Sequence, residues 1–127
     1  MKNLTLSGQS ILVVEDEALV ALDLRETLER AGAYVFAATQ LSHALQLAGH
    51  PDLSAAVLDY RLGDGDCAEV CSGLERRGIP FIFYSGYVDM QQLWPHAMCV
   101  PKPADGSRIV DAIAGALKNG RLEANAA

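Results

Sequence analysis

The amino-acid sequence predicts an α/β fold in which one parallel sheet is covered by helices on both faces. Short runs of β-branched and apolar residues, typical of buried strands, alternate with segments of helical period along the 127-residue chain. Glycines and prolines separate these segments, and no low-complexity tract or internal repeat interrupts them. Strands that alternate with helices form right-handed βαβ units, so we expect one doubly wound domain.

Five segments have the composition of strands. The first, "SILVVED", is a β-branched run with an acidic end, and the third, "LSAAVLDY", also reaches an aspartate after its apolar run. The fourth, "IPFIFYSG", is entered through Pro80, and the fifth, "AMCV", is short. The predicted strands span residues 10–16, 33–39, 53–60, 79–86 and 97–100.

Five further segments have a helical period. In the first, four apolar residues share one face, charged residues occupy the rest, and Gly32 is a natural stop. Gly73 weakens the third helix, and Pro95 closes the short fourth one. The predicted helices span residues 17–32, 41–49, 66–78, 88–96 and 104–120. We therefore expect a single domain over residues 1–120 and a frayed tail over 121–127.

Composition and charge exclude several classes of function. The net charge of −6 disfavours nucleic acids and anionic membranes as partners, because both require clustered Lys and Arg. No apolar stretch approaches the about 20 residues of a membrane span, and the N-terminus lacks a signal peptide's apolar segment. Cys67, Cys71 and Cys99 have no framework or metal-binding spacing, and we interpret them as free thiols. We expect a cytoplasmic protein.

Polar or charged residues follow four of the five predicted strands. The first strand ends in Glu15 and Asp16, the third has Asp59 at its carboxyl end, the fourth ends at Ser85, and Lys102 follows the fifth. In open α/β sheets, ligands bind beyond the carboxyl ends of the strands. Three carboxylates that converge there repel one another, so we expect a hard divalent cation, Mg²⁺ (or Mn²⁺), among them.

Taken singly, these residues carry little information. An aspartate after a strand is commonly a turn residue, and an acidic pair is commonly a helix start. Taken together, they suit phosphoryl transfer onto a carboxylate, with Asp59 as the nucleophile. Asp16 and Asp59 would hold the cation, with Glu15 acting through water, while Lys102 and Ser85 would bind the phosphoryl oxygens.

Four segments, "ILVVEDE", "AAVLDYRLGDGD", "PFIFYSGY" and "VPKP", resemble the receiver domain of bacterial two-component response regulators. The resemblance extends over essentially the whole chain and implies a flavodoxin-like (βα)5 fold with strand order 2-1-3-4-5. It implies that Asp59 accepts a phosphoryl group from a phosphohistidine on a sensor histidine kinase or a histidine phosphotransfer protein. It also implies that Arg61 gives its backbone carbonyl to Mg²⁺, and that the peptide bond between Lys102 and Pro103 is cis.

The sequence departs from the commonest receiver pattern at two positions. Gly63 stands where most receivers have proline, so we expect a more mobile loop after Asp59. Cys99 stands where a switch aromatic is usual, whereas Tyr87 follows Ser85 as in the "FATGY"-type variant found among stand-alone receivers. Tyr87 either takes over the switch or covers the fourth helix, and both interpretations stay open.

The resemblance predicts a phosphorylation-controlled module whose output is a protein contact. Phosphorylation would act on the loop after Ser85 and on the fourth helix, while Arg61 and Tyr87 would border the path of the water that hydrolyses the phosphate. We expect no enzyme beyond self-phosphorylation and self-dephosphorylation, an unknown downstream protein, and a monomer or weak homodimer. Two alternatives are a pseudo-receiver that binds partners without phosphorylation and a haloacid-dehalogenase-like phosphatase. The phosphatase motif DxDx(T/V) after the first strand is absent from this sequence.

Overall fold

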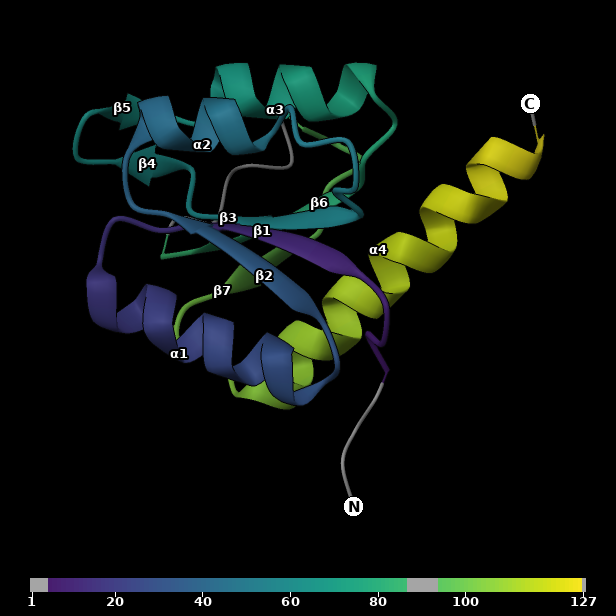
Figure 1. Ribbon diagram of the computed structural model, residues 1–127, viewed down its shortest axis with the longest axis horizontal. Helices are drawn as coiled ribbons and strands as arrows, with labels where there is room; N and C mark the ends of the chain where they lie inside the picture. Colours follow the sequence, from purple (N-terminus) through teal and green to yellow (C-terminus); the bar gives the residue numbers. More distant parts are fainter. Residues whose placement is uncertain (1–4, 87–93, 127) are drawn as a thin grey trace.

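A computed structural model describes residues 5–86 and 94–126 of the chain. It confirms the predicted sheet, whose five strands all pair in parallel (Figure 1). Their spatial order is β2-β1-β3-β6-β7, which is the predicted order 2-1-3-4-5 because β4 and β5 form a separate hairpin. The sheet consists of β1 (Ser10–Val14), β2 (Tyr34–Ala38), β3 (Ala55–Leu58), β6 (Phe81–Ser85) and β7 (Cys99–Pro101).

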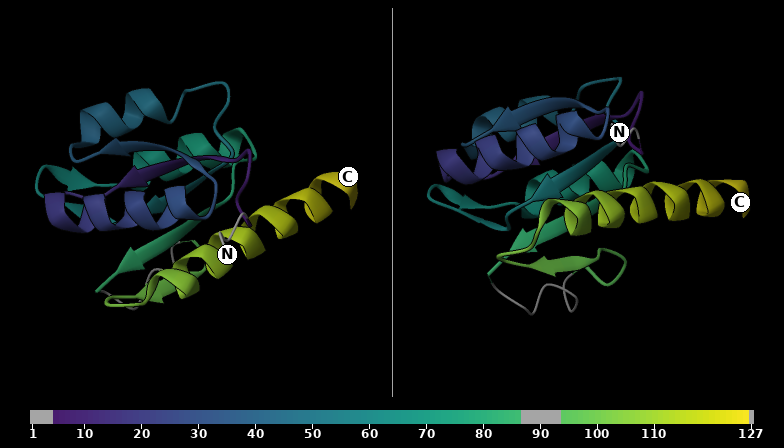
Figure 2. Two further views of the ribbon diagram at one scale, coloured as in Figure 1. Left: turned by 60° about the horizontal axis from the view of Figure 1, so that its bottom comes forward. Right: turned by 90° about the horizontal axis from the view of Figure 1, so that it is seen from below.

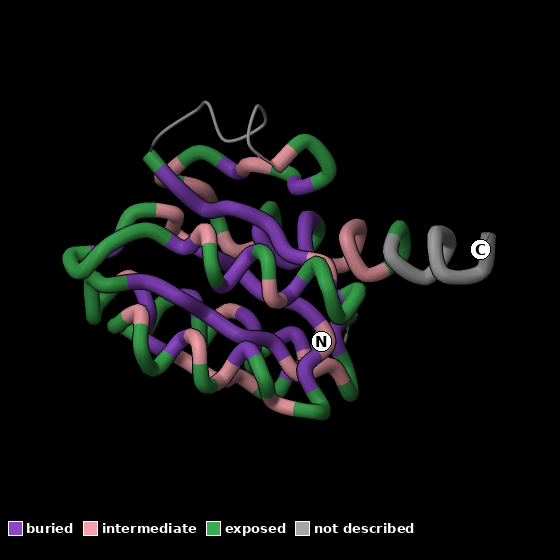
Figure 3. Tube along the Cα trace, turned by 90° about the horizontal axis from the view of Figure 1, so that it is seen from above, coloured by how far each residue is buried: buried purple, intermediate pink, exposed green. Residues whose placement is uncertain are grey.

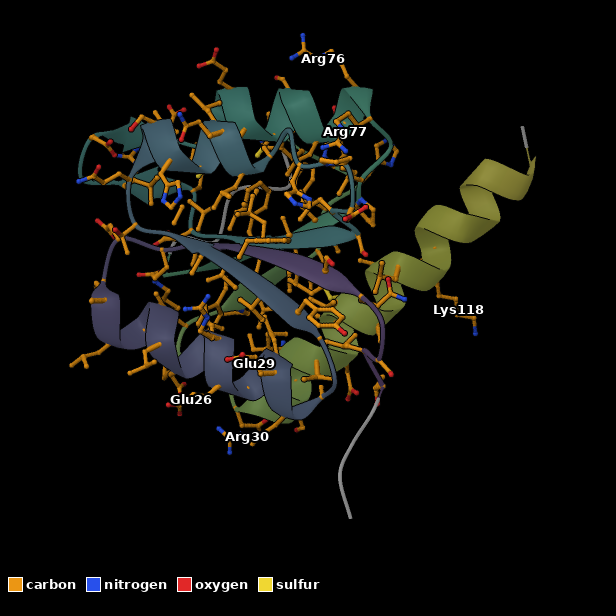
Figure 4. The ribbon with its side chains drawn as sticks, in the orientation of Figure 1. Glu26, Glu29, Arg30, Arg76, Arg77 and Lys118 are labelled. Atoms are coloured by element: carbon orange, nitrogen blue, oxygen red, sulfur yellow. The ribbon has the colours of Figure 1, made fainter. Side chains whose placement is uncertain are left out.

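The described helices lie in two layers, one on each face of the sheet (Figure 1). Helices α1 (Ala18–Arg30) and α4 (Gly106–Ala126) cover one face, and α2 (Leu41–Leu47) and α3 (Ala68–Arg76) cover the other. Figure 4 shows charged side chains of these helices, among them Arg30, Arg76 and Lys118, directed away from the sheet. Among the described helices, none is both long enough and apolar enough to cross a membrane.

Each face of the sheet has its own hydrophobic core. Alternate residues of a strand point to opposite faces, so Ile11 and Val13 pack under α1 and α4, whereas Leu12 and Val14 pack under α2 and α3. The three central strands, β1, β3 and β6, are therefore buried along almost their whole length, as the burial-coloured trace shows (Figure 3). Burial on both faces explains why the sequence of each central strand is a continuous apolar run instead of an alternating one.

The segment after Asp59 differs from the expected loop. Arg61–Leu62 forms β4 and Gly65–Asp66 forms β5, and the two pair in antiparallel fashion. Gly65 has a φ of 145°, which residues with a side chain rarely adopt, so this glycine permits the tight return. The expected glycine-rich loop is therefore a short hairpin.

The C-terminal helix also differs from expectation. The sequence predicted a stop at Gly120, but α4 continues to Ala126, and its end extends beyond the sheet (Figures 1 and 2). A glycine inside a helix costs only about 1 kcal/mol, and the following Arg, Leu, Glu and Ala are favourable helix formers. The helix predicted over 88–96 falls largely on residues 87–93, outside the described part of the chain.

Candidate functional site

The predicted site residues meet at the carboxyl edge of the sheet. Glu15, Asp59 and Lys102 each stand two positions after a valine of the core under α1 and α4, namely Val13, Val57 and Val100. Because side chains two apart along a strand share a face, the three charged side chains extend from the same face of three strands. The period of two thus brings residues together that are 87 and 43 positions apart in sequence.

Backbone hydrogen bonds continue past the strand ends and fix these residues. The Asp59 N–H donates to the carbonyl of Val14 at 2.8 Å, and the Lys102 N–H donates to the carbonyl of Ser85 at 3.0 Å. The Glu15 N–H donates to the carbonyl of Ala38 at 3.1 Å. The sheet therefore holds the backbone of all three charged residues, which is the rigidity that a reactive site requires.

Lys102 joins the two carboxylates. Its Nζ lies 2.9 Å from Glu15 Oε2 and 3.0 Å from Asp59 Oδ2. The side chain of Glu15 is 1% exposed, that of Asp59 12% and that of Lys102 21%. The other oxygen of Glu15, Oε1, accepts a hydrogen bond from the Glu17 N–H at 3.3 Å. The ammonium thus supplies a shared counter-charge in a region that water reaches only in part.

Burial and hydrogen bonding shift the pKa values of Glu15 and Lys102. Desolvation raises the pKa of Glu15 to about 7, although the hydrogen bond from Lys102 opposes this rise. Burial alone would lower the pKa of Lys102, but the hydrogen bonds to Glu15 and Asp59 outweigh it and raise that pKa. The ammonium therefore stays charged, and Glu15 is the group whose negative charge is costly.

Three carboxylates in this cluster are placed to hold a metal ion. Glu15, Asp16 and Asp59 each offer an oxygen, and these oxygens lie within 4.8 Å of one another. Hard carboxylate oxygens suit Mg²⁺ or Mn²⁺, and Asp16 is exposed, so a cation there would keep solvent on one side. Arg61 is the first residue of β4, two positions after Asp59, and its carbonyl stays a predicted ligand.

Ser85 is the last residue of β6 and is 1% exposed. It pairs in register with Pro101, the residue before Lys102, so the structure places it at the same edge as the charged cluster. The Lys102–Pro103 peptide bond is cis, as the resemblance implied. Tyr87, the predicted switch residue, lies outside the described residues.

A protein-family model, that of the response regulator receiver domain, matches residues 11–114, which is most of the chain. The chain belongs to the response regulator receiver domain family. Solved structures share the fold of this chain. A response regulator receiver protein from Sinorhizobium medicae has a TM-score of 0.79 at 23% identity, over 88% of this chain and 96% of its own. A CheY-like receiver domain protein from Methanospirillum hungatei has a TM-score of 0.81 at 22% identity, over 92% and 99% of the two chains.

The non-phosphorylated HemR receiver domain from Leptospira biflexa has a TM-score of 0.75 at 25% identity. That match covers 86% of this chain and 94% of the HemR chain. No curated protein matches this receiver domain by sequence. The similarities to solved structures therefore support the fold of this chain.

Two residues at the site of this receiver domain, Cys67 and Tyr84, make contacts that were not predicted from the sequence. The thiol of Cys67, a fully buried residue, donates to the backbone carbonyl of Asp59 at 3.0 Å. The hydroxyl of Tyr84 accepts a hydrogen bond from the Ala104 N–H at 3.1 Å, and the Tyr84 ring lies beside the Lys102 ammonium. The period of two could have placed Tyr84 on the face of Lys102, but the register between β6 and β7 had to be known.

The three cysteines and Trp94 contribute to packing. Cys67 and Cys71 are buried and Cys99 is partly buried, and no disulfide joins any of these three described residues. Burial raises the pKa of Cys67 to about 12, so this thiol is protonated and unreactive at neutral pH. Trp94 packs edge-on against Phe81, with ring centroids 6.0 Å apart.

Proposed function

We propose that this receiver domain is a phosphorylation-controlled signalling module in which Asp59 is the phosphoacceptor. The observation that carries the proposal is the contact of one ammonium, Lys102, with Asp59 and the buried Glu15 at the carboxyl edge. An ammonium 3.0 Å from the acceptor carboxylate also lies within reach of a phosphoryl group on that carboxylate. Family membership supports the same assignment.

The phosphoryl donor is a phosphohistidine on a sensor histidine kinase or a histidine phosphotransfer protein. An Asp59 oxygen forms the new bond to phosphorus as the nitrogen–phosphorus bond breaks, and the electron pair of that bond returns to the imidazole. Lys102 and the Ser85 hydroxyl bind phosphoryl oxygens. The donor histidine is charged from ATP, so the exchange is proposed to occur in the cytoplasm.

A divalent cation belongs to this proposal. Asp16, Asp59 and the Arg61 carbonyl would hold Mg²⁺ or Mn²⁺, with Glu15 acting through water. The cation, when bound, supplies positive charge that shields the carboxylates from the phosphoryl oxygens. The chain's own contribution is the fixed placement of Asp59 and Lys102 at the ends of two strands.

The decisive experiment incubates the chain with acetyl phosphate and Mg²⁺ and records the intact mass. We expect one added phosphate in the wild type, none in Asp59→Asn, and none without a divalent cation. Asp52→Asn, which changes an exposed aspartate before β3, is the matched control and should still gain one phosphate. A phosphate adduct of full yield in Asp59→Asn would overturn the assignment, and none in the wild type would favour the pseudo-receiver alternative.

The output of the module is a change in protein contacts, with self-phosphorylation and self-dephosphorylation as its only catalysis. We propose that phosphorylation acts through Ser85 and the segment that follows it. Hydrogen exchange over residues 86–98 should change when beryllofluoride, a phosphate mimic, binds with Mg²⁺. A change confined to residues 60–66 would contradict this route.

The free domain is proposed to be a monomer or weak homodimer that binds neither nucleic acid nor membrane.

A further inference from the structure

Tyr84 contacts both the side chain of Lys102 and the backbone that follows it. Tyr84 lies in β6, is 8% exposed and belongs to the core under α1 and α4. The centroid of its ring lies 5.6 Å from the Lys102 Nζ. Its hydroxyl accepts a hydrogen bond from the backbone N–H of Ala104, two residues after Lys102, at 3.1 Å. One side chain therefore meets both the charged end of Lys102 and the backbone turn that carries it.

The sheet register explains how one side chain makes both contacts. Tyr84 pairs with Val100 across β6 and β7, and Lys102 stands two residues beyond Val100 on the same face. The Lys102 N–H also donates to the carbonyl of Ser85, the residue after Tyr84. The ammonium thus lies diagonally across the strand pair from the ring, and the turn after Lys102 folds back over the hydroxyl.

The two contacts have different physical effects. An ammonium within about 6 Å of an aromatic centroid is attracted by the negative face of the ring. This attraction does not depend on Glu15 or Asp59, so it persists when a cation or a phosphoryl group changes the charge of those carboxylates. The hydroxyl satisfies the Ala104 N–H and fixes the backbone from which the Lys102 side chain extends.

We propose that Tyr84 is a positioning residue for phosphoryl transfer to Asp59, because it holds the Lys102 ammonium at the acceptor after the carboxylates are neutralised. This inference rests on the proposed phosphorylation of Asp59. It assigns separate tasks to the ring, which attracts the ammonium, and to the hydroxyl, which fixes the turn. Tyr84 itself does not touch the phosphoryl group in this scheme and acts through Lys102.

The test compares Tyr84→Phe, which keeps the ring, with Tyr84→Leu, which removes ring and hydroxyl together. Tyr34→Phe is the control for loss of a tyrosine hydroxyl, since Tyr34 is 69% exposed on the edge strand β2. Ile113→Val is the control for a loosened core, because Ile113 is buried in the same core as Tyr84. For each variant, the rate of phosphorylation by acetyl phosphate is measured at saturating donor and across a Mg²⁺ titration.

We expect Tyr84→Phe to lower the maximal rate about threefold and Tyr84→Leu at least tenfold, a factor equivalent to about 1.4 kcal/mol of barrier. The half-saturating Mg²⁺ concentration should stay within about twofold, because Glu15, Asp16 and Asp59 are unchanged. Both controls should keep the wild-type rate. Equal maximal rates in all variants, or a rate loss in Ile113→Val as large as in Tyr84→Leu, would overturn the inference.

A second measurement does not depend on phosphorylation. Unfolding midpoints of Tyr84→Leu, Lys102→Met and the double variant form a double-mutant cycle. We expect the double variant to shift the midpoint by less than the sum of the single shifts, because the lost contact is counted once. Additive shifts would show that the ring does not hold the ammonium. If the wild type itself is not phosphorylated, the proposed function fails; if it is and only the Tyr84 prediction fails, the inference fails alone.

Discussion

The carboxyl edge of the sheet, where the parallel strands end, and its amino edge, where they begin, use charged side chains in different ways. At the carboxyl edge, where the β4–β5 hairpin lies in Figure 1, the partly buried Lys102 is bonded to two carboxylates, one of them 1% exposed. At the amino edge, the exposed Arg77 donates to the neutral carbonyls of Ala48 and His50 (Figure 4). Ser10 and Ser54 close the same edge, since each backbone N–H bonds to the other residue.

This difference shows how one fold separates stability from chemistry. The bonds of the amino edge connect groups whose charges do not oppose one another, so they stabilise the fold without a further partner. The carboxyl edge brings three carboxylates within 4.8 Å of one another, and one ammonium meets only two of them. A cation bound at that edge would therefore stabilise the folded state, and the charged side chains there are available to bind a ligand.

The largest expected difference between the edges is in phosphorylation rate. Lys102→Met removes the ammonium that faces Asp59 and should slow phosphorylation by acetyl phosphate at least 100-fold. Arg77→Met removes a cation of the amino edge and should leave that rate unchanged, while it lowers the free energy of unfolding by about 1 kcal/mol. Time-resolved intact mass and urea unfolding measure the two effects. Slower phosphorylation of Arg77→Met, or a wild-type phosphorylation rate in Lys102→Met, would contradict this difference between the two edges.

The lifetime of the phosphate should also depend on residues near the carboxyl edge. The family resemblance predicts that Arg61 and Tyr87 border the approach of the hydrolytic water, and we expect their bulk to shield the bond. We expect Arg61→Asn/Tyr87→Ala to lose phosphate about tenfold faster, equivalent to about 1.4 kcal/mol of barrier. The decay of the phosphorylated mass after removal of acetyl phosphate measures this rate. An unchanged or slower decay in the double variant would show that these side chains do not control the water.

Mg²⁺ should stabilise the fold through the carboxyl edge only. At a cation concentration ten times the dissociation constant, binding adds about 1.4 kcal/mol, which corresponds to a rise of about 4 °C in Tm for a domain of this size. Asp16→Ala should abolish the rise, and Asp52→Ala, which changes an exposed aspartate at the amino edge, should preserve it. Thermal melts with and without Mg²⁺ decide the question, and a full shift in Asp16→Ala would contradict the site.

A further expected difference is a pH dependence of stability without a divalent cation. Burial raises the pKa of Glu15 from 4.5 to about 7, so the folded state holds this proton more tightly than the unfolded chain. The stabilisation that comes from protonated Glu15 in the folded state is complete below pH 4.5 and is lost as the pH rises through about 7. Urea midpoints at pH 5 and pH 8 should differ less in Glu15→Gln than in the wild type. Glu29→Gln, at the opposite end of α1, should behave as the wild type does.

The sequence predicted the sheet and the convergence of its charges because both follow from local pattern. Apolar runs define the strands, and strand ends in a parallel sheet meet at one edge, so Glu15, Asp59 and Lys102 could be grouped without coordinates. The contact of Tyr84 with Lys102 could not be predicted, because it depends on the register between two strands. The hairpin at 61–66 was missed because its return depends on the backbone angle of Gly65.

Placement by the period of two makes the site sensitive to changes in chain length during evolution. One residue inserted between Val57 and Asp59 would send the acceptor carboxylate to the opposite face of the sheet, among the apolar side chains under α2 and α3. The same insertion at the tip of the β4–β5 hairpin would leave every strand in phase. The domain can therefore change its surface loops freely, while β1, β3 and β7 must keep their length to the residue.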